Sequence, residues 1–383
     1  MQVADRMESI PFSEIRKIFE EVVRREKQGQ SIIHMEIGRP DFDTPQHIKA
    51  AAKKALDDGL VHYSSNYGLM ELREAIAGKF NRDNGIDYNP KNEILVTLGV
   101  TEGLFLSMMA LMNHGDEILV PTPCFPHYIH SARMAGAHVV PVPLQENNNF
   151  NLNIDDIKSR LTPKTRMIII NTPGNPTGAI FTKDALNAVA ELAREHDLYV
   201  LSDEIYEKMI YENNRHISIA GLPGMRERTI TLNGFSKNYA MTGWRLGYAA
   251  SSTQVISAMV RIHQYATVCP VTFAQWGAIE ALNGPQDCVD EMVKEFDRRR
   301  ILVTQRLQGM DSISLVPPKG AFYALPNVSG IEKTPQELAA YLLDEAGISV
   351  VPWGKYHIRL SYANSYENLE KAMDNMAAAL KKL

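Results

Sequence analysis

The feature that most constrains the fold is an alternation of short apolar runs with stretches of helical periodicity along the middle of the chain. Helix-period stretches such as 102–112 and 184–196 separate the runs. Short apolar runs are typical of strands buried on both faces of a parallel sheet, with helices as the crossovers. The sequence therefore predicts a doubly wound α/β domain with a mostly parallel central sheet and helices on both faces. Its expected strands are 94–98, 117–120, 166–170, 198–201 and 229–232.

The C-terminal part follows a different pattern. A long, charged amphipathic helix over 288–307 precedes short apolar segments at 321–324 and 358–361 and a closing helix over 366–383. A chain of 383 residues also exceeds the roughly 250–300 residues at which a single core stops growing. We therefore expect a second, smaller α+β domain.

Composition excludes several classes of protein. A net charge of -5 and a pI near 6.1 argue against a nucleic-acid partner, which requires a basic surface. The first residues include Asp5 and Glu8 and lack the apolar run of a secretory signal. No apolar stretch approaches the ~18 residues of a membrane span. Three cysteines without metal-ligand spacing favour a reduced, cytoplasmic setting, with no metal site and no membrane partner.

Polar, turn-rich segments follow each of the expected strands. Ligands of open α/β sheets bind beyond the carboxyl ends of the strands, so one rim of the sheet is the expected ligand site. The segments are 99–103, 121–126, 171–178, 202–206 and 234–237.

Lys237 follows a strand and a glycine. A desolvated lysine there can lose its proton and attack carbonyls, although most lysines are solvated surface residues. Ser236 and Arg245 could hold a phosphate nearby. Segment 99–103 opens a helix, where backbone amides attract anions. Taken alone, that segment reads better as an ordinary strand-to-helix turn, because it matches neither the P-loop nor the dinucleotide motif.

Asp203 ends an apolar run, where a carboxylate is costly unless it is paired. A protonated pyridine nitrogen would pair with it, and Tyr206 could then reach a phenolic oxygen on the same ring. A helix cap explains Asp203 equally well on its own.

Together these segments resemble the class I aminotransferases of fold type I, the aspartate aminotransferase family. The resemblance runs from about Ile37 to Ala363, and the lysine signature 236–247 is complete at its Ser, Lys, Gly, Arg and Gly positions. The other matching segments are 38–45, 63–73, 171–178, 202–206 and 359–363. The resemblance implies a large domain over 46–283 that binds pyridoxal 5′-phosphate (PLP), and a small domain formed by 1–45 and 284–383.

The resemblance also implies a role for each matching residue. Lys237 would hold the cofactor as a Schiff base and later move the substrate's α-proton, and Asp203 would keep the pyridine nitrogen protonated. Tyr63 would reach the phosphate from the neighbouring subunit of a homodimer with shared active sites, although it could instead be a half-buried packing residue of its own subunit. The remaining roles are the phenolic oxygen for Asn175 and Tyr206, ring stacking for Phe125, the phosphate for Val100, Thr101, Ser236 and Arg245, and the substrate for Gly38, Asn175 and Arg359.

The implied activity is transfer of an amino group from an L-amino acid to a 2-oxo acid by a ping-pong mechanism. A carbon–sulfur β-lyase on the same scaffold would show the same cofactor residues. A non-catalytic PLP-binding regulator is the third alternative, but no basic helix-turn-helix precedes Ile37, and Arg359 is retained.

Two departures from the family pattern affect the substrate site. The segment 353–358, between Pro352 and Arg359, is shorter than the family's Gly-rich loop. Neither Thr101 nor Gln264 supplies a cation for a second carboxylate, whereas Arg39 could approach the substrate. We therefore expect donors that are not restricted to dicarboxylic amino acids.

Overall fold

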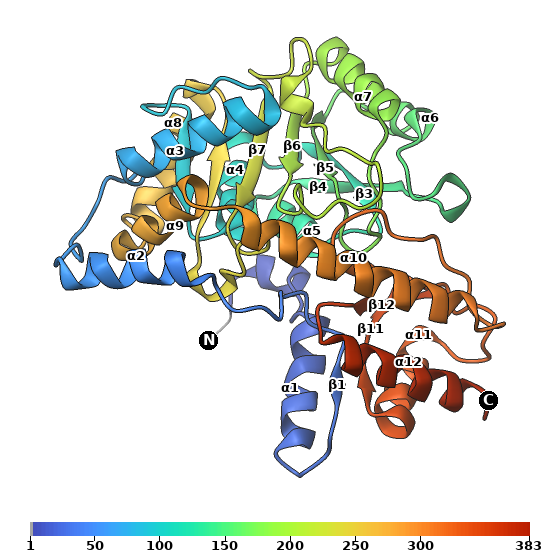
Figure 1. Cartoon of the computed structure of the whole chain (residues 1–383). Helices are drawn as coiled ribbons and strands as arrows, with labels where there is room; N and C mark the ends of the chain where they lie inside the picture. The colour runs from blue at the N-terminus through green and yellow to red at the C-terminus, as the bar shows by residue number, and fades with distance from the viewer. Residues whose placement is uncertain (1–2) are drawn as a thin grey trace.

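The computed structural model describes residues 3–383, which are built around a seven-stranded sheet. Its strands are β2 (Ile94–Thr97), β3 (Glu117–Thr122), β4 (His138–Pro143), β5 (Thr165–Asn171), β6 (Tyr199–Asp203), β7 (Thr229–Gly234) and β8 (Gly247–Ala250). The order across the sheet is β2-β8-β7-β6-β5-β3-β4 (Figure 1). β8 runs antiparallel between β2 and β7, while the others share one direction. The mostly parallel α/β sheet is thus confirmed.

The sequence prediction missed two strands, β4 and β8. β4 reads His-Val-Val-Pro-Val-Pro and is only partly buried, as befits an edge strand. β8 consists of Gly-Tyr-Ala-Ala, so it lacks the branched apolar residues that mark a strand. Both segments form strands because they pair with adjacent strands, and their own residue pattern does not predict this.

Both faces of the sheet are covered by helices, and β5 shows why. Met167 and Ile169 pack in a cluster with residues of α4 (Val100–Leu111) and α8 (Thr253–Ala266). Ile168 and Ile170 point the other way and pack against α7 (Lys183–Glu195). The other helices around the sheet are α2 (Gln46–Asp57), α3 (Met70–Lys79), α5 (His127–Met134), α6 (Ile154–Lys158) and α9 (Thr272–Asn283).

The two ends of the chain meet in a second group of elements below the sheet (Figure 1). β1 (Ile33–His34) pairs in parallel with β10 (Ile348–Ser349). A three-stranded antiparallel sheet has the order β11 (Val351–Trp353), β12 (His357–Ser361) and β9 (Tyr323–Ala324). Its helices are α1 (Glu14–Glu26), α10 (Asp287–Gln308), α11 (Pro335–Tyr341) and α12 (Tyr366–Leu380). Short 3-10 turns lie at η1 (Asp5–Ser9), η3 (Glu146–Asn148), η4 (Ile219–Gly221) and η5 (Thr242–Trp244), and π turns at η2 (Phe80–Asn84) and η6 (Leu342–Ala346).

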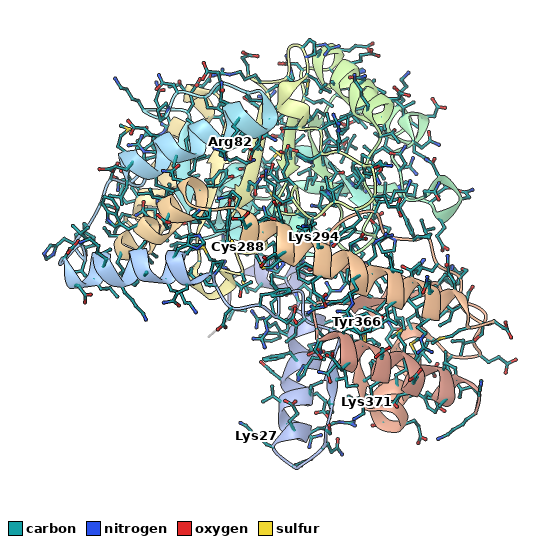
Figure 2. The ribbon with its side chains drawn as sticks, in the orientation of Figure 1. Lys27, Arg82, Cys288, Lys294, Tyr366 and Lys371 are labelled. Carbon is teal, nitrogen blue, oxygen red and sulfur yellow. The ribbon has the colours of Figure 1, made fainter. Side chains whose placement is uncertain are left out.

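α10 links the two groups. Figure 2 shows Cys288 and Lys294 along it, with α12, marked by Tyr366 and Lys371, lying beneath its second half. The Arg298 guanidinium of α10 lies 3.7 Å from the centre of the Tyr366 ring. The division into 46–283 against 1–45 with 284–383 stays a prediction, because one cluster contains both Ile205, next to β6, and Phe296 of α10.

The short segment before Arg359 closes as a β-hairpin. Trp353 pairs with His357, and Val351 with Arg359. Gly354 begins the connection with φ +59, a conformation that favours glycine. The hairpin therefore brings Arg359 to a defined place without a longer loop. Among residues 3–383, no helix has the length and apolar character that crossing a membrane requires.

Candidate active site

A cavity of about 610 Å³ lies at the carboxyl ends of the parallel strands; we call it the central cavity. It is lined by every residue to which the sequence assigned a site role, except Tyr63. These are Gly38, Val100, Thr101, Phe125, Asn175, Asp203, Tyr206, Ser236, Lys237, Arg245 and Arg359. Loops far apart in the sequence converge here because parallel strands end at one edge of the sheet.

Lys237 lies three residues beyond β7, and its Nζ donates a hydrogen bond to the Gly38 carbonyl oxygen. Burial, aided by the positive charges of Arg359 and Arg245, lowers the pKa of Lys237 to about 8, against the opposing effect of Asp203. An amine with this pKa is partly neutral near pH 7. It is therefore available as a nucleophile or a base.

Asp203 ends β6 and is 5% exposed. The Tyr128 hydroxyl donates to its Oδ2 at 2.7 Å, and the Ile205 amide donates to Oδ1 at 3.2 Å. Burial raises the pKa of Asp203 to about 6, although both hydrogen bonds oppose the rise. Within residues 3–383 it forms no ion pair. It therefore suits a cationic partner inside the cavity, such as a protonated pyridine nitrogen. Tyr128 was missed by the sequence analysis, since no motif marks it.

Arg359 is 2% exposed, yet no carboxylate of the described chain pairs with it. One Nη donates to Asn175 Oδ1 at 3.2 Å and the other to the Glu36 carbonyl oxygen, while Nε has no partner. The rings of Tyr323 and Trp353 lie 4.8 and 5.3 Å from the guanidinium carbon. A buried guanidinium without a counter-charge is unfavourable, so Arg359 suits an anionic ligand such as a carboxylate.

Tyr206 and Asn175 are held by neighbours at the rim. The hydroxyls of Tyr206 and Tyr323 are 2.8 Å apart, and Tyr323 also lines the central cavity. The Asn175 amide donates to Asn171 Oδ1 at 2.9 Å. Tyr323 carries no motif and comes from a distant part of the chain, so its place in the cavity was not predicted from the sequence.

The start of α4 forms a cradle for an anion. Gly99 has φ +82, and a Cβ there would lie 2.5 Å from Arg245 Nη2. Arg245 is held by the carbonyl oxygens of Leu98 (3.1 Å) and Thr242 (2.9 Å). Val100 and Thr101 begin the helix, so their amides have no carbonyl one turn earlier. Two free amides beside a guanidinium suit a phosphate dianion.

Tyr63 lies outside the central cavity and is 86% exposed. The alternative that it packs inside its own subunit is therefore wrong. Tyr265 and Val268 are exposed too, and Asn66 Nδ2 donates to the Val268 carbonyl oxygen at 2.6 Å. The segments that carry Tyr63 and Val268 are thus joined, and together they present apolar surface.

Two arginines line the central cavity without an acidic partner in the part of the chain that the structure describes. Arg39 follows Gly38, and Arg16 comes from the first turn of α1. The apolar residues Ile15, Phe19 and Ile37 line the same region. Gln264 does not line it. Arg16 was not identified from the sequence, because α1 lies outside the motifs.

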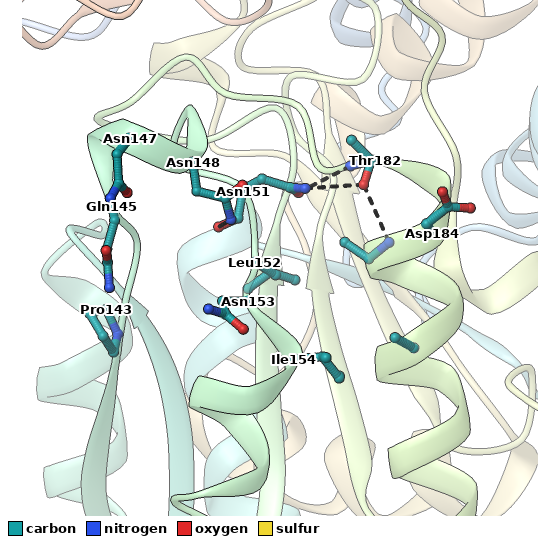
Figure 3. Close-up of a pocket in the computed structure, with 12 residues that line it drawn as sticks. Pro143, Gln145, Asn147, Asn148, Asn151, Leu152, Asn153, Ile154, Thr182 and Asp184 are labelled. Atoms are coloured by element: carbon teal, nitrogen blue, oxygen red, sulfur yellow. Dashed lines mark hydrogen bonds between the residues drawn. The ribbon is translucent and has the colours of Figure 1, made fainter.

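A second cavity of about 620 Å³ lies farther out on the sheet edge, between the loop after β4 and the start of α7 (Figure 3). Amide side chains dominate its lining, and Asn151 Nδ2 donates to Thr182 Oγ1 at 3.1 Å. None of the residues with a predicted role lines this cavity.

Glu204, Glu207 and His216 place their ligand-type atoms within 4.8 Å of one another, a grouping that the sequence analysis did not anticipate. Lys79 Nζ lies 2.5 Å from Glu207, and His216 Nε2 lies 2.8 Å from Glu204. Ser218 Oγ also donates to Glu204 at 2.8 Å. These contacts make the group a buried ionic network that begins one residue after Asp203.

The chain is similar to known proteins along nearly its whole length. The model of the family "Aminotransferase class I and II" matches residues 30–376. Aromatic-amino-acid aminotransferase 2 of Thermococcus litoralis is 46% identical over 390 residues, covering 100% of the chain and 99% of that protein. Aspartate aminotransferase of Pyrococcus abyssi is 46% identical over 389 residues, with 100% and 99% covered. The solved aromatic aminotransferase of Pyrococcus horikoshii is 48% identical, with a TM-score of 0.90 over 94% of the chain and 99% of that structure.

Proposed function

The chain belongs to the class I and II aminotransferases, and from this premise we propose that it works with pyridoxal 5′-phosphate held on Lys237 and accepts acidic as well as neutral amino acids. The family inferred from the motifs is confirmed, and the chain is an aminotransferase. Its relatives are named as aminotransferases, so the β-lyase alternative has no support.

The observation that carries the cofactor proposal is a set of buried charges in one cavity. Asp203 is an anion without a cation, Arg359 is a cation without an anion, and the Lys237 amine has a lowered pKa. A cofactor with a protonated pyridine nitrogen and a substrate with a carboxylate would neutralise the first two. The cradle at Gly99 and Arg245 fits the cofactor's phosphate.

Each side chain then has a distinct part in the reaction. When bound, pyridoxal phosphate supplies the electron sink that makes the α-proton of an amino acid acidic. Lys237, with its lowered pKa, would accept and return that proton, and Asp203 would pair with the ring nitrogen and keep it protonated. Arg359 binds the α-carboxylate and so orients the α-hydrogen toward Lys237. The amino acid and the oxo acid would use the same Arg359 in turn, and the amino group would stay on the loaded enzyme between the two half-reactions, so ping-pong kinetics are expected.

The proposed range of amino-acid donors is inferred from the side chains that line the central cavity. Arg16 and Arg39 can meet a second carboxylate, whereas Ile15, Phe19 and Ile37 offer apolar surface to a neutral side chain. Two relatives of equal identity are named for aromatic amino acids and for aspartate. Both observations favour a site that takes acidic and neutral donors.

We also propose a homodimer in which Tyr63 reaches the partner's site. Its exposure, and the apolar surface it shares with Tyr265 and Val268, support burial against a second copy. A reducing, cytoplasmic setting is proposed as well, since Cys124, Cys269 and Cys288 are free.

Borohydride reduction of the cofactor-loaded protein tests the central proposal. Peptide mapping should find the reduced cofactor on Lys237, and Lys237→Ala should lose turnover. Mixing the enzyme with single amino acids and following the cofactor spectrum then defines the donors. Attachment to another lysine, or no spectral change with any amino acid, contradicts the proposal.

A further inference from the structure

The ring of Phe125 is held from two sides by the first residues of α5. It stacks on the imidazole of His127, with ring centroids 4.2 Å apart and an angle of 10° between the planes. The Tyr128 ring meets it edge-on, at 5.8 Å and 83°. Tyr128 also donates to Asp203. Two consecutive residues of one helix therefore constrain both the aromatic ring and the carboxylate.

The local backbone explains this arrangement. Pro126 is the N-cap of α5, with φ -58 and ψ -23, and its ring permits little change in φ. A fixed residue between Phe125 and His127 limits how far the two side chains can move apart. The stack is therefore built into the start of the helix.

The His127 side chain makes no hydrogen bond or ion pair within residues 3–383, so the stack is its distinctive interaction. Burial lowers the pKa of His127, and the positive potential of His130 and Arg16 adds to the effect. The imidazole is therefore neutral at neutral pH. A neutral, flat ring is suited to stack on another aromatic ring.

Phe125 and His127 both line the central cavity, together with Asp203 and Lys237. Since His127 covers one face of the Phe125 ring, the opposite face is the one left for a ligand ring. A side chain already held in place loses less conformational freedom when a ligand binds, and such preorganisation raises affinity.

We propose that His127 is a positioning residue that acts through Phe125: it fixes the ring on which the cofactor would stack and thereby strengthens cofactor binding. The proposal rests on the proposed function, since it assumes that a pyridine ring occupies the central cavity and stacks on Phe125. It assigns a role to a residue for which the sequence carried no motif.

The test measures the affinity of the cofactor-free protein for pyridoxamine 5′-phosphate, which has no aldehyde and so cannot bond to Lys237. We expect His127→Ala to weaken binding about 3- to 10-fold, the range of one aromatic pair. His127→Phe should restore affinity, because it keeps a flat ring. His130→Ala is the matched control: it removes the same kind of side chain from the next turn of α5, outside the cavity, and should leave affinity unchanged.

Two further measurements separate positioning from a general loss of structure. In a Phe125→Leu background, His127→Ala should have no further effect on affinity, since the partner ring is gone. The circular dichroism of the bound cofactor, which reports its orientation, should change in His127→Ala and recover in His127→Phe. Parental affinity in His127→Ala, or equal weakening in His127→Ala and His127→Phe, overturns the proposal. If the parent protein itself fails to bind pyridoxamine phosphate, the proposed function fails first.

Discussion

Asp203 and Arg359 are both buried, and neither has a charged partner in the described part of the chain. Lys237 lies in the same cavity with a pKa lowered to about 8. Each of these groups is unfavourable in the isolated chain. In the proposed function, a cofactor and a substrate would neutralise these groups, so the stability lost at the site would become ligand affinity.

The cost of Asp203 can be measured in the cofactor-free protein. The folded pKa of Asp203, about 6, lies above the ordinary value of 3.8, so the folded protein binds this proton more tightly than the unfolded chain does. The stabilisation that the protonated carboxyl gives is complete below pH 3.8 and is lost as pH rises through 6. Asp203→Asn removes the charge. We therefore expect the free energy of unfolding of the cofactor-free variant to exceed that of the parent by about 1–2 kcal/mol at pH 7.5. Denaturant titration measures this difference, which should be smaller at pH 4.5. The loaded variant should lose most of its turnover. Equal stability of the two proteins at pH 7.5 would show that the charge of Asp203 does not destabilise the folded protein.

Arg359→Lys tests how the substrate carboxylate is held. A point charge cannot reproduce the two parallel hydrogen bonds of a guanidinium. We expect KM for neutral amino acids and for 2-oxo acids to rise by about 10- to 100-fold, with a smaller change in kcat. Arg228→Lys, outside the central cavity, is the control. Unchanged KM values would exclude Arg359 from the substrate site.

At the scale of elements, the first turns of helices and a β-hairpin position the residues of the central cavity. The first turn of α4 supplies amides, the start of α5 supplies Tyr128 and His127, and the hairpin of β11 and β12 delivers Arg359. A substitution at the start of a helix or in such a hairpin should therefore weaken ligand binding or local packing more than a similar substitution elsewhere.

Gly99→Ala should both strain the backbone and displace Arg245, because the new Cβ would lie 2.5 Å from Nη2. Gly29→Ala is a matched control: φ there is +89, but nothing lies within 4 Å. We expect both variants to lose about 1–2 kcal/mol of stability. Only Gly99→Ala should also weaken cofactor binding, which titration of the cofactor-free proteins can measure. Similar cofactor affinity in the two variants would argue against the cradle.

His34 joins α1 to the chain that follows β1. Its Nδ1 lies 2.7 Å from Glu36 Oε1 and its Nε2 3.0 Å from Glu26 Oε1. The Glu36 hydrogen bond is the main cause that raises the pKa of His34 to about 9. Because the folded pKa is raised, the stabilisation is complete below pH 6.5 and is lost as pH rises through 9. His34→Gln should destabilise the protein at pH 6 by at most about 1 kcal/mol, and hardly at pH 10. Denaturant unfolding at both pH values checks this, and a pH-independent difference would contradict it.

At the scale of the whole molecule, the apolar surface around Tyr63, Tyr265 and Val268 is exposed in the single chain. In the proposed homodimer, this surface is buried against a second copy and Tyr63 lies near the partner's central cavity. Two sites per dimer, each built from both chains, would follow from such symmetry.

Mixing two inactive variants tests the shared site. We expect light scattering to show a dimer, and Tyr63→Phe and Lys237→Ala each to lose activity as homodimers. After mixed refolding, a dimer of one chain of each kind should regain one intact site, because both defects fall in the other site. An active monomer, or no recovery in verified mixed dimers, would exclude the shared arrangement.

The sequence alone determined the mostly parallel sheet and most of the site. Strands buried on both faces need a continuous run of apolar residues, as 167–170 show. The residue types of Lys237, Asp203 and Arg359 at or near strand ends indicated the chemistry of the cavity. The tertiary structure alone decided what surrounds them. β8 has no strand pattern of its own and is fixed by its two neighbours. Tyr128, His127, Tyr323 and Arg16 enter the site because α5, β9 and α1 pack beside it. Such contacts depend on the relative placement of distant segments, which no local pattern of residues encodes.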